Sequence, residues 1–193
     1  MRVVAFNGSP RKDGNTARLL REVLLELEKE GVETDLVHIG GRPVHGCTAC
    51  MKCFEKKDGR CVIESDIVND CIAAMTESDG ILIGSPTYFA DVSPETKALI
   101  DRAGFVSIAN DSMFARKLGA AVVAARRAGA VHAYDTINHL FGISEMITIG
   151  SSYWNIGLGL GPGEVEEDAE GLETMRTLGR NMAWLLKKVH AGE

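Results

Sequence analysis

The sequence Arg2-Val-Val-Ala-Phe-Asn-Gly-Ser-Pro-Arg-Lys-Asp-Gly-Asn-Thr16 contains a short apolar run, a polar loop with two glycines and the start of a helix. Residues 3–6 are apolar without alternation, which is typical of a strand in a parallel sheet covered on both faces. A helix is expected to follow to about Lys29, with Asn15 or Thr16 as its N-cap. This strand–loop–helix unit predicts an α/β fold.

The loop of this unit is expected to bind an anion. Backbone N–H groups and the positive end of a helix dipole converge where a strand turns into a helix. The loop has neither the P-loop pattern nor Gly-x-Gly-x-x-Gly, so nucleoside triphosphate and classical dinucleotide sites are disfavoured. Its side chains suit one phosphomonoester, and the candidate residues are Ser9, Arg11, Lys12, Asn15 and Thr16. The alternative is a capped turn that binds nothing.

The remaining chain repeats the alternation of apolar runs and amphipathic segments. Strands are expected at 34–39, 80–84, 118–125 and 145–149, and helices at 66–77, 94–102, 131–141 and 168–190. Residues 105–117 are expected to be irregular, and residues 150–163 to form a glycine-rich loop. Together these segments predict one α/β domain over residues 1–193, a flavodoxin-like doubly wound five-stranded parallel sheet with helices on both faces.

Two further loops follow strands of this sheet and should reach the same edge as the anion loop. The loop after the third strand contains Pro86, Thr87, Tyr88 and Phe89, whose aromatic rings and hydroxyls can flank a planar ring. The loop after the fourth strand carries Arg126 and Arg127 before Gly129. An arginine there can address a ring carbonyl or a phosphate. These residues complete a predicted cofactor site.

Four of the five cysteines lie in a loop insertion at 43–62, with the spacing Cys47-x2-Cys50-x2-Cys53-x7-Cys61. Neighbours this close do not form relaxed disulfides. The Cys-x2-Cys-x2-Cys run is typical of iron–sulfur ligation, whereas zinc sites usually separate two ligand pairs by a dozen or more residues. A four-iron cluster is the first interpretation, with redox-active or free thiols and zinc as the alternatives. We expect the insertion at the carboxyl edge of the sheet, and Cys71 in the core.

Composition excludes several classes of function. The formal net charge of −6 argues against a nucleic-acid partner. No apolar run approaches the roughly 20 residues needed to span a bilayer, and the N-terminus shows no signal peptide. Clustered cysteines without such a signal predict a reducing, cytoplasmic location. The five histidines lack metal-ligand spacing, although His45 lies two residues before Cys47.

Three motifs in this order resemble the NADPH-dependent FMN reductase superfamily: Gly8-Ser-Pro-Arg-Lys-x-Gly-Asn-Thr16, Gly46-Cys-x2-Cys-x2-Cys53 with Cys61, and Gly84-Ser-Pro-Thr-Tyr88. Within that superfamily the sequence is most similar to the iron–sulfur flavoprotein branch. The resemblance implies FMN, with its phosphate on Ser9, Arg11, Asn15 and Thr16 and its ring against Pro86–Phe89 and Arg126–Gly129. It implies a 4Fe-4S cluster on Cys47, Cys50, Cys53 and Cys61.

The resemblance also implies an enzyme, an NAD(P)H-dependent FMN-containing oxidoreductase, that exchanges electrons with a small-molecule or protein redox partner. It implies a homodimer or homotetramer in which a neighbouring subunit helps to close the flavin site. Three other interpretations stay open: an NAD(P)H-dependent FMN or quinone reductase without a cluster, a flavodoxin-like electron carrier, and a thiol redox or metal sensor. A cluster distinguishes the first interpretation from the cluster-free reductase, and NAD(P)H turnover distinguishes a reductase from a pure carrier.

Overall fold

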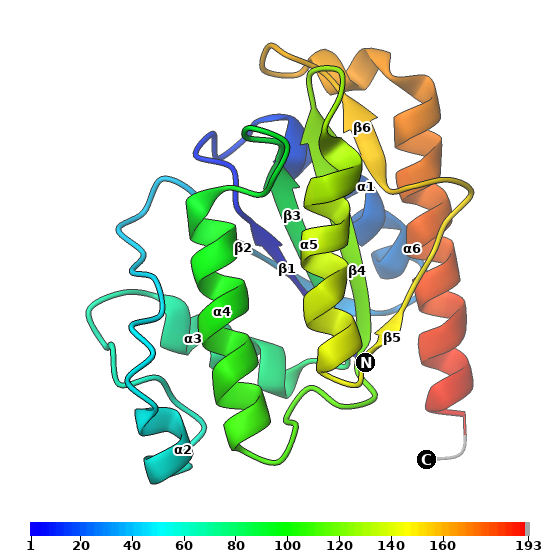
Figure 1. Ribbon diagram of the computed structural model, residues 1–193. Coiled ribbons are helices and arrows are strands. Elements are labelled where there is room, and N and C mark those ends of the chain that lie inside the picture. Colours follow the sequence, from blue (N-terminus) through cyan, green and yellow to red (C-terminus); the bar gives the residue numbers. More distant parts are fainter. Residues whose placement is uncertain (192–193) are drawn as a thin grey trace.

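A computed structural model describes residues 1–191 and shows one parallel sheet (Figure 1). The strands follow the order β2-β1-β3-β4-β5, and β6 also pairs with β4, on the same edge as β5. Their bounds are β1 (Arg2–Asn7), β2 (Glu33–His38), β3 (Gly80–Pro86), β4 (Leu118–Ala125), β5 (Ile147–Thr148) and β6 (Ile156–Leu158). This arrangement confirms the predicted flavodoxin-like topology.

The fifth position of the sheet differs from the prediction. The strand expected at 145–149 is only two residues long, and β5 pairs with Leu118 and Gly119 at the start of β4. The chain then leaves the sheet and returns as β6, which pairs with residues 123–125 at the end of β4. The expected glycine-rich loop therefore contains a strand. β5 and β6 therefore both pair with the same edge of β4, and the segment between them, which leaves the sheet, interrupts the pairing.

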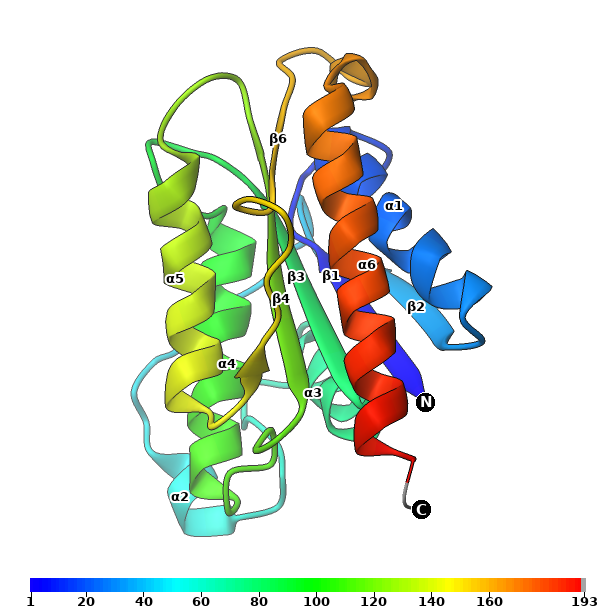
Figure 2. The same cartoon turned by 90° about the vertical axis from the view of Figure 1, so that its right-hand side faces the viewer.

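Helices cover both faces of the sheet (Figure 2). The helices α1 (Asn15–Lys29) and α6 (Ala169–Val189) pack on one face, and α3 (Val68–Glu77), α4 (Pro94–Ala109) and α5 (Ala130–Ile143) pack on the other. Two short helices, α2 (Lys52–Lys56) and the 3-10 helix η1 (Glu164–Glu167), were not expected. In β1, Val4 and Phe6 join the α3–α4–α5 core, whereas Val3 and Ala5 join the α1–α6 core. Burial on both faces explains why this strand has no polar alternation.

Helix α4 is longer than predicted. It begins at Pro94, with the Ser93 side chain accepting a hydrogen bond from Thr96 N as its N-cap, both as expected. It continues to Ala109 instead of ending at Arg102, because Ala103, Val106 and Ala109 extend its buried stripe. Only the second part of the stretch expected to be irregular lies outside the helix.

The last long helix, α6, is amphipathic as predicted, with Met175, Leu178 and Met182 fully buried against α1 and the sheet. Val189, which we placed on the same apolar seam, is exposed in the last turn. Among residues 1–191, no helix is both long enough and apolar enough to cross a membrane.

Candidate functional site

A cleft of about 180 Å³ lies where β1, β3 and β4 end, at the upper end of the sheet in Figure 1. β1 and β3 are neighbours, and the chain leaves them toward opposite faces of the sheet. Such a switch point is where open α/β sheets bind ligands. The cleft is lined by Ser9, Arg11, Asn15, Thr16, Pro86, Thr87, Tyr88, Ala124, Ala125, Arg126, Gly159 and Leu160. These include all the predicted cofactor residues except Lys12, Phe89 and Gly129.

The loop after β1 is shaped by two side chains that sequence reasoning missed. Asn7 Nδ2 donates to Lys12 O at 3.1 Å, and Asn7 Oδ1 accepts from Ser9 N at 3.0 Å. From the end of β2, His38 Nε2 lies 2.8 Å from Ser9 O. An amide residue at the last position of a buried strand was the available signal for Asn7. For His38 there was none, because its partner is 29 residues away.

The prediction that Asn15 or Thr16 caps α1 was wrong. Gly14 occupies the N-cap in an extended conformation and makes no side-chain cap. The Asn15 side chain instead binds the segment after β6, donating through Nδ2 to Gly161 O at 3.0 Å and accepting through Oδ1 from Gly163 N at 2.9 Å. Arg11 Nη1 also donates to Leu160 O at 3.1 Å. These contacts bring the glycine-rich segment over the anion loop as a wall of the cleft.

The aromatic loop after β3 ends in a tight turn at the rim of the cleft. Tyr88 N donates to Asp91 O at 2.8 Å and Asp91 N donates to Tyr88 O at 3.0 Å. The two central residues, Phe89 and Ala90, both have positive φ, at 47° and 65°, as a two-residue hairpin turn requires. Tyr88 lines the cleft, whereas the Phe89 side chain is fully exposed at the tip. A Cβ on Gly129 would lie 3.1 Å from Ala90 Cα, so Gly129 and this turn form one rim.

Replacing Ala90 with glycine is expected to stabilise the protein by up to about 1 kcal/mol, because glycine adopts positive φ without the steric cost of a Cβ. Ala128→Gly is the matched control, since Ala128 is exposed in the neighbouring loop without positive φ. Urea unfolding of both variants measures the difference. A loss of stability in Ala90→Gly equal to that in the control would contradict the assigned strain.

Thr87 offers the cleft an unused polar group. Its backbone N–H donates to Ala124 O at 2.8 Å, which fixes the residue beside β4. Its Oγ1 is buried and, among the described residues, has no hydrogen-bond partner. A buried hydroxyl without a partner carries a desolvation cost that a ligand atom can relieve. The cleft therefore fits a ligand that exchanges a hydrogen bond with Thr87.

The cysteine loop lies elsewhere than predicted. It starts at the carboxyl edge of the sheet, but in Figure 1 α2 lies at the opposite end of the molecule from the loops that follow β1 and β3, beside the second half of α4. Phe54 of α2 meets Phe105 of α4 edge to face, with ring centroids 6.4 Å apart. Gly59 N donates to Asn110 Oδ1 at 2.9 Å. These contacts hold the insertion outside α4, which overturns our placement of it at the sheet edge.

The four predicted metal ligands line one small pocket of about 20 Å³, together with Arg102, Phe105 and Val106 of α4. Among residues 1–191, however, no group of three or more His, Cys, Asp or Glu side chains is arranged to hold a metal ion. The structure therefore brings Cys47, Cys50, Cys53 and Cys61 to one pocket, but it does not place three of them in a geometry that could coordinate one metal ion.

The thiols differ in acidity. Hydrogen bonds from the backbone of Lys52 and from the Thr48 side chain lower the pKa of Cys50, which favours the thiolate that binds metals. Burial raises the pKa of Cys53. Burial also raises the pKa of Cys71 to about 12, and this residue lies in the core as predicted.

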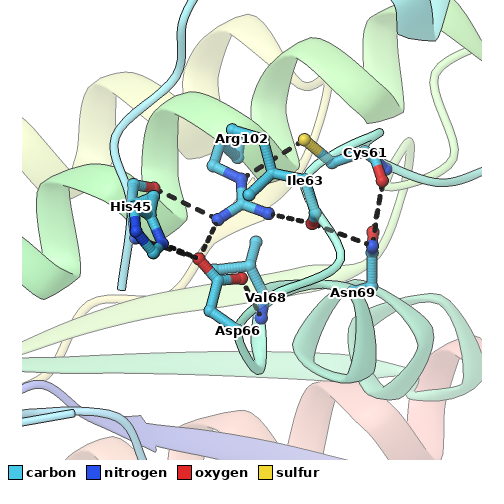
Figure 3. A network of polar contacts seen from close by, with 7 residues as sticks. All are labelled: His45, Cys61, Ile63, Asp66, Val68, Asn69 and Arg102. Carbon is cyan, nitrogen blue, oxygen red and sulfur yellow. Dashed lines mark hydrogen bonds and ion pairs between the residues drawn. The ribbon is translucent and has the colours of Figure 1, made fainter. Parts of the chain in front are cut away.

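A buried arginine joins the cysteine loop to α4 (Figure 3). The Arg102 side chain is fully buried and makes an ion pair with the equally buried Asp66, with Nη1 and Oδ2 2.6 Å apart. Its remaining N–H groups donate to Cys61 Sγ at 3.3 Å, to Ile63 O at 2.8 Å and to His45 O at 3.1 Å. Sequence reasoning missed Arg102 and Asp66. The available signal was an arginine on the apolar stripe of a helix, three residues after Leu99.

Burial alone would raise the pKa of Asp66, but hydrogen bonds from Arg102 and from the backbone of His45 and Val68 outweigh it and hold this pKa at about 2. His45, the histidine closest to the cysteine run in sequence, belongs to the same network. Its N–H donates to Asp66 Oδ2 at 2.9 Å, and its Nδ1 lies 3.3 Å from the same oxygen. His45 therefore contributes to holding the loop.

A parallel sheet of this order with a polar cleft at the β1/β3 switch point defines a flavodoxin-like protein. Residues 1–161 match the model of the NADPH-dependent FMN reductase family. The chain belongs to this family and is an FMN-containing oxidoreductase.

Named relatives and solved structures agree with this assignment. An iron–sulfur flavoprotein of Methanocaldococcus jannaschii is 36% identical over 98% of this chain and 99% of its own length. The iron–sulfur flavoprotein of Methanosarcina thermophila is 29% identical over 98% of this chain and 97% of its own length. Among solved structures, a WrbA-like flavodoxin of Agrobacterium tumefaciens aligns with a TM-score of 0.66 at 18% identity, covering 97% of both chains. At that identity the structural match shows the fold alone.

Proposed function

We propose that this protein moves electrons between a reduced donor, FMN bound in the cleft and a 4Fe-4S cluster held by Cys47, Cys50, Cys53 and Cys61. The observation that carries the flavin site is the cleft at the β1/β3 switch point. Its lining combines side chains that can donate hydrogen bonds to a phosphate with Thr87, whose buried hydroxyl has no described partner. FMN supplies the chemistry when bound, as an acceptor of hydride and a carrier of single electrons.

The chain binds and orients this cofactor through three walls. Ser9, Arg11 and Thr16, with the N–H groups at the start of α1, offer hydroxyls, a guanidinium and a helix N-terminus to the phosphate. Asn15 keeps the glycine-rich wall closed over that loop. Lys12 adds positive charge to the loop without lining the cleft.

The second and third walls address the flavin ring. Pro86, Thr87 and Tyr88 offer an apolar face and hydroxyl groups, and Arg126, in the loop after β4, offers a cation. Positive charge there stabilises negative charge that develops on a bound ring system. Phe89 and Gly129 lie at the edge of the cleft, where Phe89 is exposed and free to cover a bound ring.

The four cysteines fit a cluster by donor chemistry and by their common pocket. The relatives' name, iron–sulfur flavoprotein, supports the same proposal. A cluster when bound supplies one-electron transfer. The second candidate is an NAD(P)H-dependent FMN or quinone reductase without a cluster. It is favoured by the side-chain arrangement, because among residues 1–191 no three potential ligands are placed to coordinate one metal ion.

We further propose NAD(P)H as the electron donor, a small molecule or a protein as the acceptor, and a cytoplasmic homodimer or homotetramer as the working form. The family's description supports the donor. Tyr153 and Trp154 form an exposed aromatic pair, with centroids 4.8 Å apart, on the excursion between β5 and β6. Exposed aromatic clusters of this kind suit contact with another subunit.

An anaerobic visible spectrum, with iron and acid-labile sulfide assayed on the same sample, tests the proposal. Flavin bands together with about four irons per chain would support it. The iron should disappear when Cys47, Cys50, Cys53 and Cys61 are all replaced by serine. Cys71→Ala is the control and should retain iron, because Cys71 is buried in the core and does not line the pocket. Flavin without iron would leave the cluster-free reductase, and no flavin after addition of FMN would refute both.

Replacing Thr87 with valine should weaken FMN binding by about 5- to 20-fold, the cost of one hydrogen bond, without lowering the stability of the FMN-free protein. Valine has the shape of threonine and removes a hydroxyl that has no described partner. Fluorescence titration with FMN and urea unfolding of the FMN-free protein measure the two effects. Loss of stability with unchanged FMN affinity would show that the hydroxyl serves the fold rather than the ligand.

A further inference from the structure

Arg102 has the largest fully buried side chain among the described residues. It does not line the flavin cleft. A buried guanidinium is costly unless its five N–H groups find acceptors. Here the acceptors come from the cysteine insertion and its flanks: Cys61 Sγ, Ile63 O, His45 O and Asp66 Oδ2 (Figure 3). One side chain of α4 therefore holds both ends of the loop that carries the four cysteines.

The Cys61 side of this network is fixed by a second anchor. Cys61 N donates to Asn69 Oδ1 at 2.8 Å, and Asn69 Nδ2 donates back to Cys61 O at 2.9 Å. Asn69 lies in the first turn of α3 and is buried. The backbone of Cys61 is thus held by α3 and its sulfur by α4. Within the described residues, Cys47 and Cys50 are exposed by contrast.

From this geometry we infer that Arg102 is a positioning residue for the cysteine site. It holds Cys61 and the segment 45–66 in place before any metal arrives, and its Nε–H donates to the Cys61 sulfur. The role in cluster chemistry rests on the proposed function, whereas the role in ordering the loop does not. A donor to a ligand sulfur withdraws electron density from it, which makes a bound cluster easier to reduce.

Arg60 provides a matched control for Arg102. Arg60 directly precedes Cys61 but is exposed. Its backbone N–H donates to Asp58 Oδ1, and its guanidinium makes no hydrogen bond or ion pair with any residue that the structure describes. Arg60→Gln therefore removes a positive charge close to Cys61 in sequence without touching the network. Arg102→Lys keeps the charge of Arg102 but cannot reproduce the fork that reaches four acceptors.

The first experiment uses the full-length metal-free protein and measures hydrogen–deuterium exchange of segment 45–66. Arg102→Lys should raise exchange in this segment at least about tenfold, since it unmakes several hydrogen bonds of a charged group. Arg60→Gln should leave exchange unchanged. Equal exchange in Arg102→Lys and the parent protein would overturn the inference, whether or not a cluster ever forms.

The second experiment reconstitutes the parent and both variants with ferrous iron and sulfide, and measures the cluster's midpoint potential and its loss rate in a chelator. Arg102→Lys should shift the potential to a more negative value and speed iron loss, while Arg60→Gln matches the parent. A purely structural role would not move the potential. If the parent takes up no iron, the proposed cluster fails and the exchange result alone decides the role of Arg102. A cluster with an unchanged potential in Arg102→Lys would refute the sulfur contact.

Discussion

Replacing Asp66 with alanine should lower the free energy of unfolding by about 3–5 kcal/mol. The side chains of Asp66 and Arg102 are both fully buried, with Oδ2 and Nη1 2.6 Å apart. Removing one partner of such a pair leaves an uncompensated charge in the interior, and that cost far exceeds the Coulomb gain of an exposed pair. Urea or thermal unfolding of the purified protein measures the change.

Asp101→Ala is the matched control for this prediction. Asp101 precedes Arg102 on α4 and pairs with Lys97, but both side chains are partly exposed. The control should cost less than about 1 kcal/mol. Equal losses in the two variants would mean that burial does not govern the Asp66 pair, and would contradict the network as described.

The same pair predicts how stability depends on pH. The pKa of Asp66 is held at about 2 in the folded protein, below the ordinary value of 3.8 for an aspartate side chain. A depressed carboxyl pKa contributes stability that is fully present above the unfolded pKa and is lost as pH falls toward the folded value. This difference corresponds to about 2 kcal/mol, lost between roughly pH 5 and 2. The parent protein should therefore lose more stability than Asp66→Asn over that range.

The strands and helices of this fold followed from local patterns, and its exceptions have local causes. Buried strands such as β1 show no polar alternation over residues 3–6, because both faces are covered. The end of α4 was missed because the largest apolar residues of its second half, Phe105 and Ile108, are exposed and lie off the buried stripe, which continues through Ala103, Val106 and Ala109. β6 was missed because three residues between glycine-rich turns give no period to detect.

The candidate site also has a part that could be predicted from the sequence and a part that could not. Residues that follow a strand in sequence, such as Ser9 and Tyr88, were predictable, because parallel strands end at one edge. Contacts between distant segments were not predictable. The hydrogen bonds of Asn15 with the segment near Gly161 span 146 residues or more, and Arg102 meets Cys61 across 41. The place of the cysteine loop also depends on such a contact, and the spacing of its cysteines contains no information about it.

Gly40→Ala should weaken FMN binding by at least about tenfold and lower the free energy of unfolding by about 1–3 kcal/mol. Gly40 follows β2 and lies directly against the anion loop, where its N–H donates to Asn7 O at 3.1 Å. A Cβ at this position would lie 2.2 Å from the carbonyl carbon and oxygen of Ser9 and 2.6 Å from Gly8 O. These are backbone atoms that no side-chain rotation can move away.

Relieving these contacts requires the peptides on both sides of Ser9 to shift, and His38, which lies 2.8 Å from Ser9 O, shifts with them. The phosphate donors of the loop then lose their alignment with the start of α1. Gly46→Ala is the control, because it lies in the same connection and a Cβ there meets nothing within 4 Å. FMN titration and urea unfolding of both variants measure the two effects. Gly40→Ala with the control's FMN affinity would mean that the position of Ser9 does not govern binding, and the phosphate would have to be held by the Arg11 and Thr16 side chains alone.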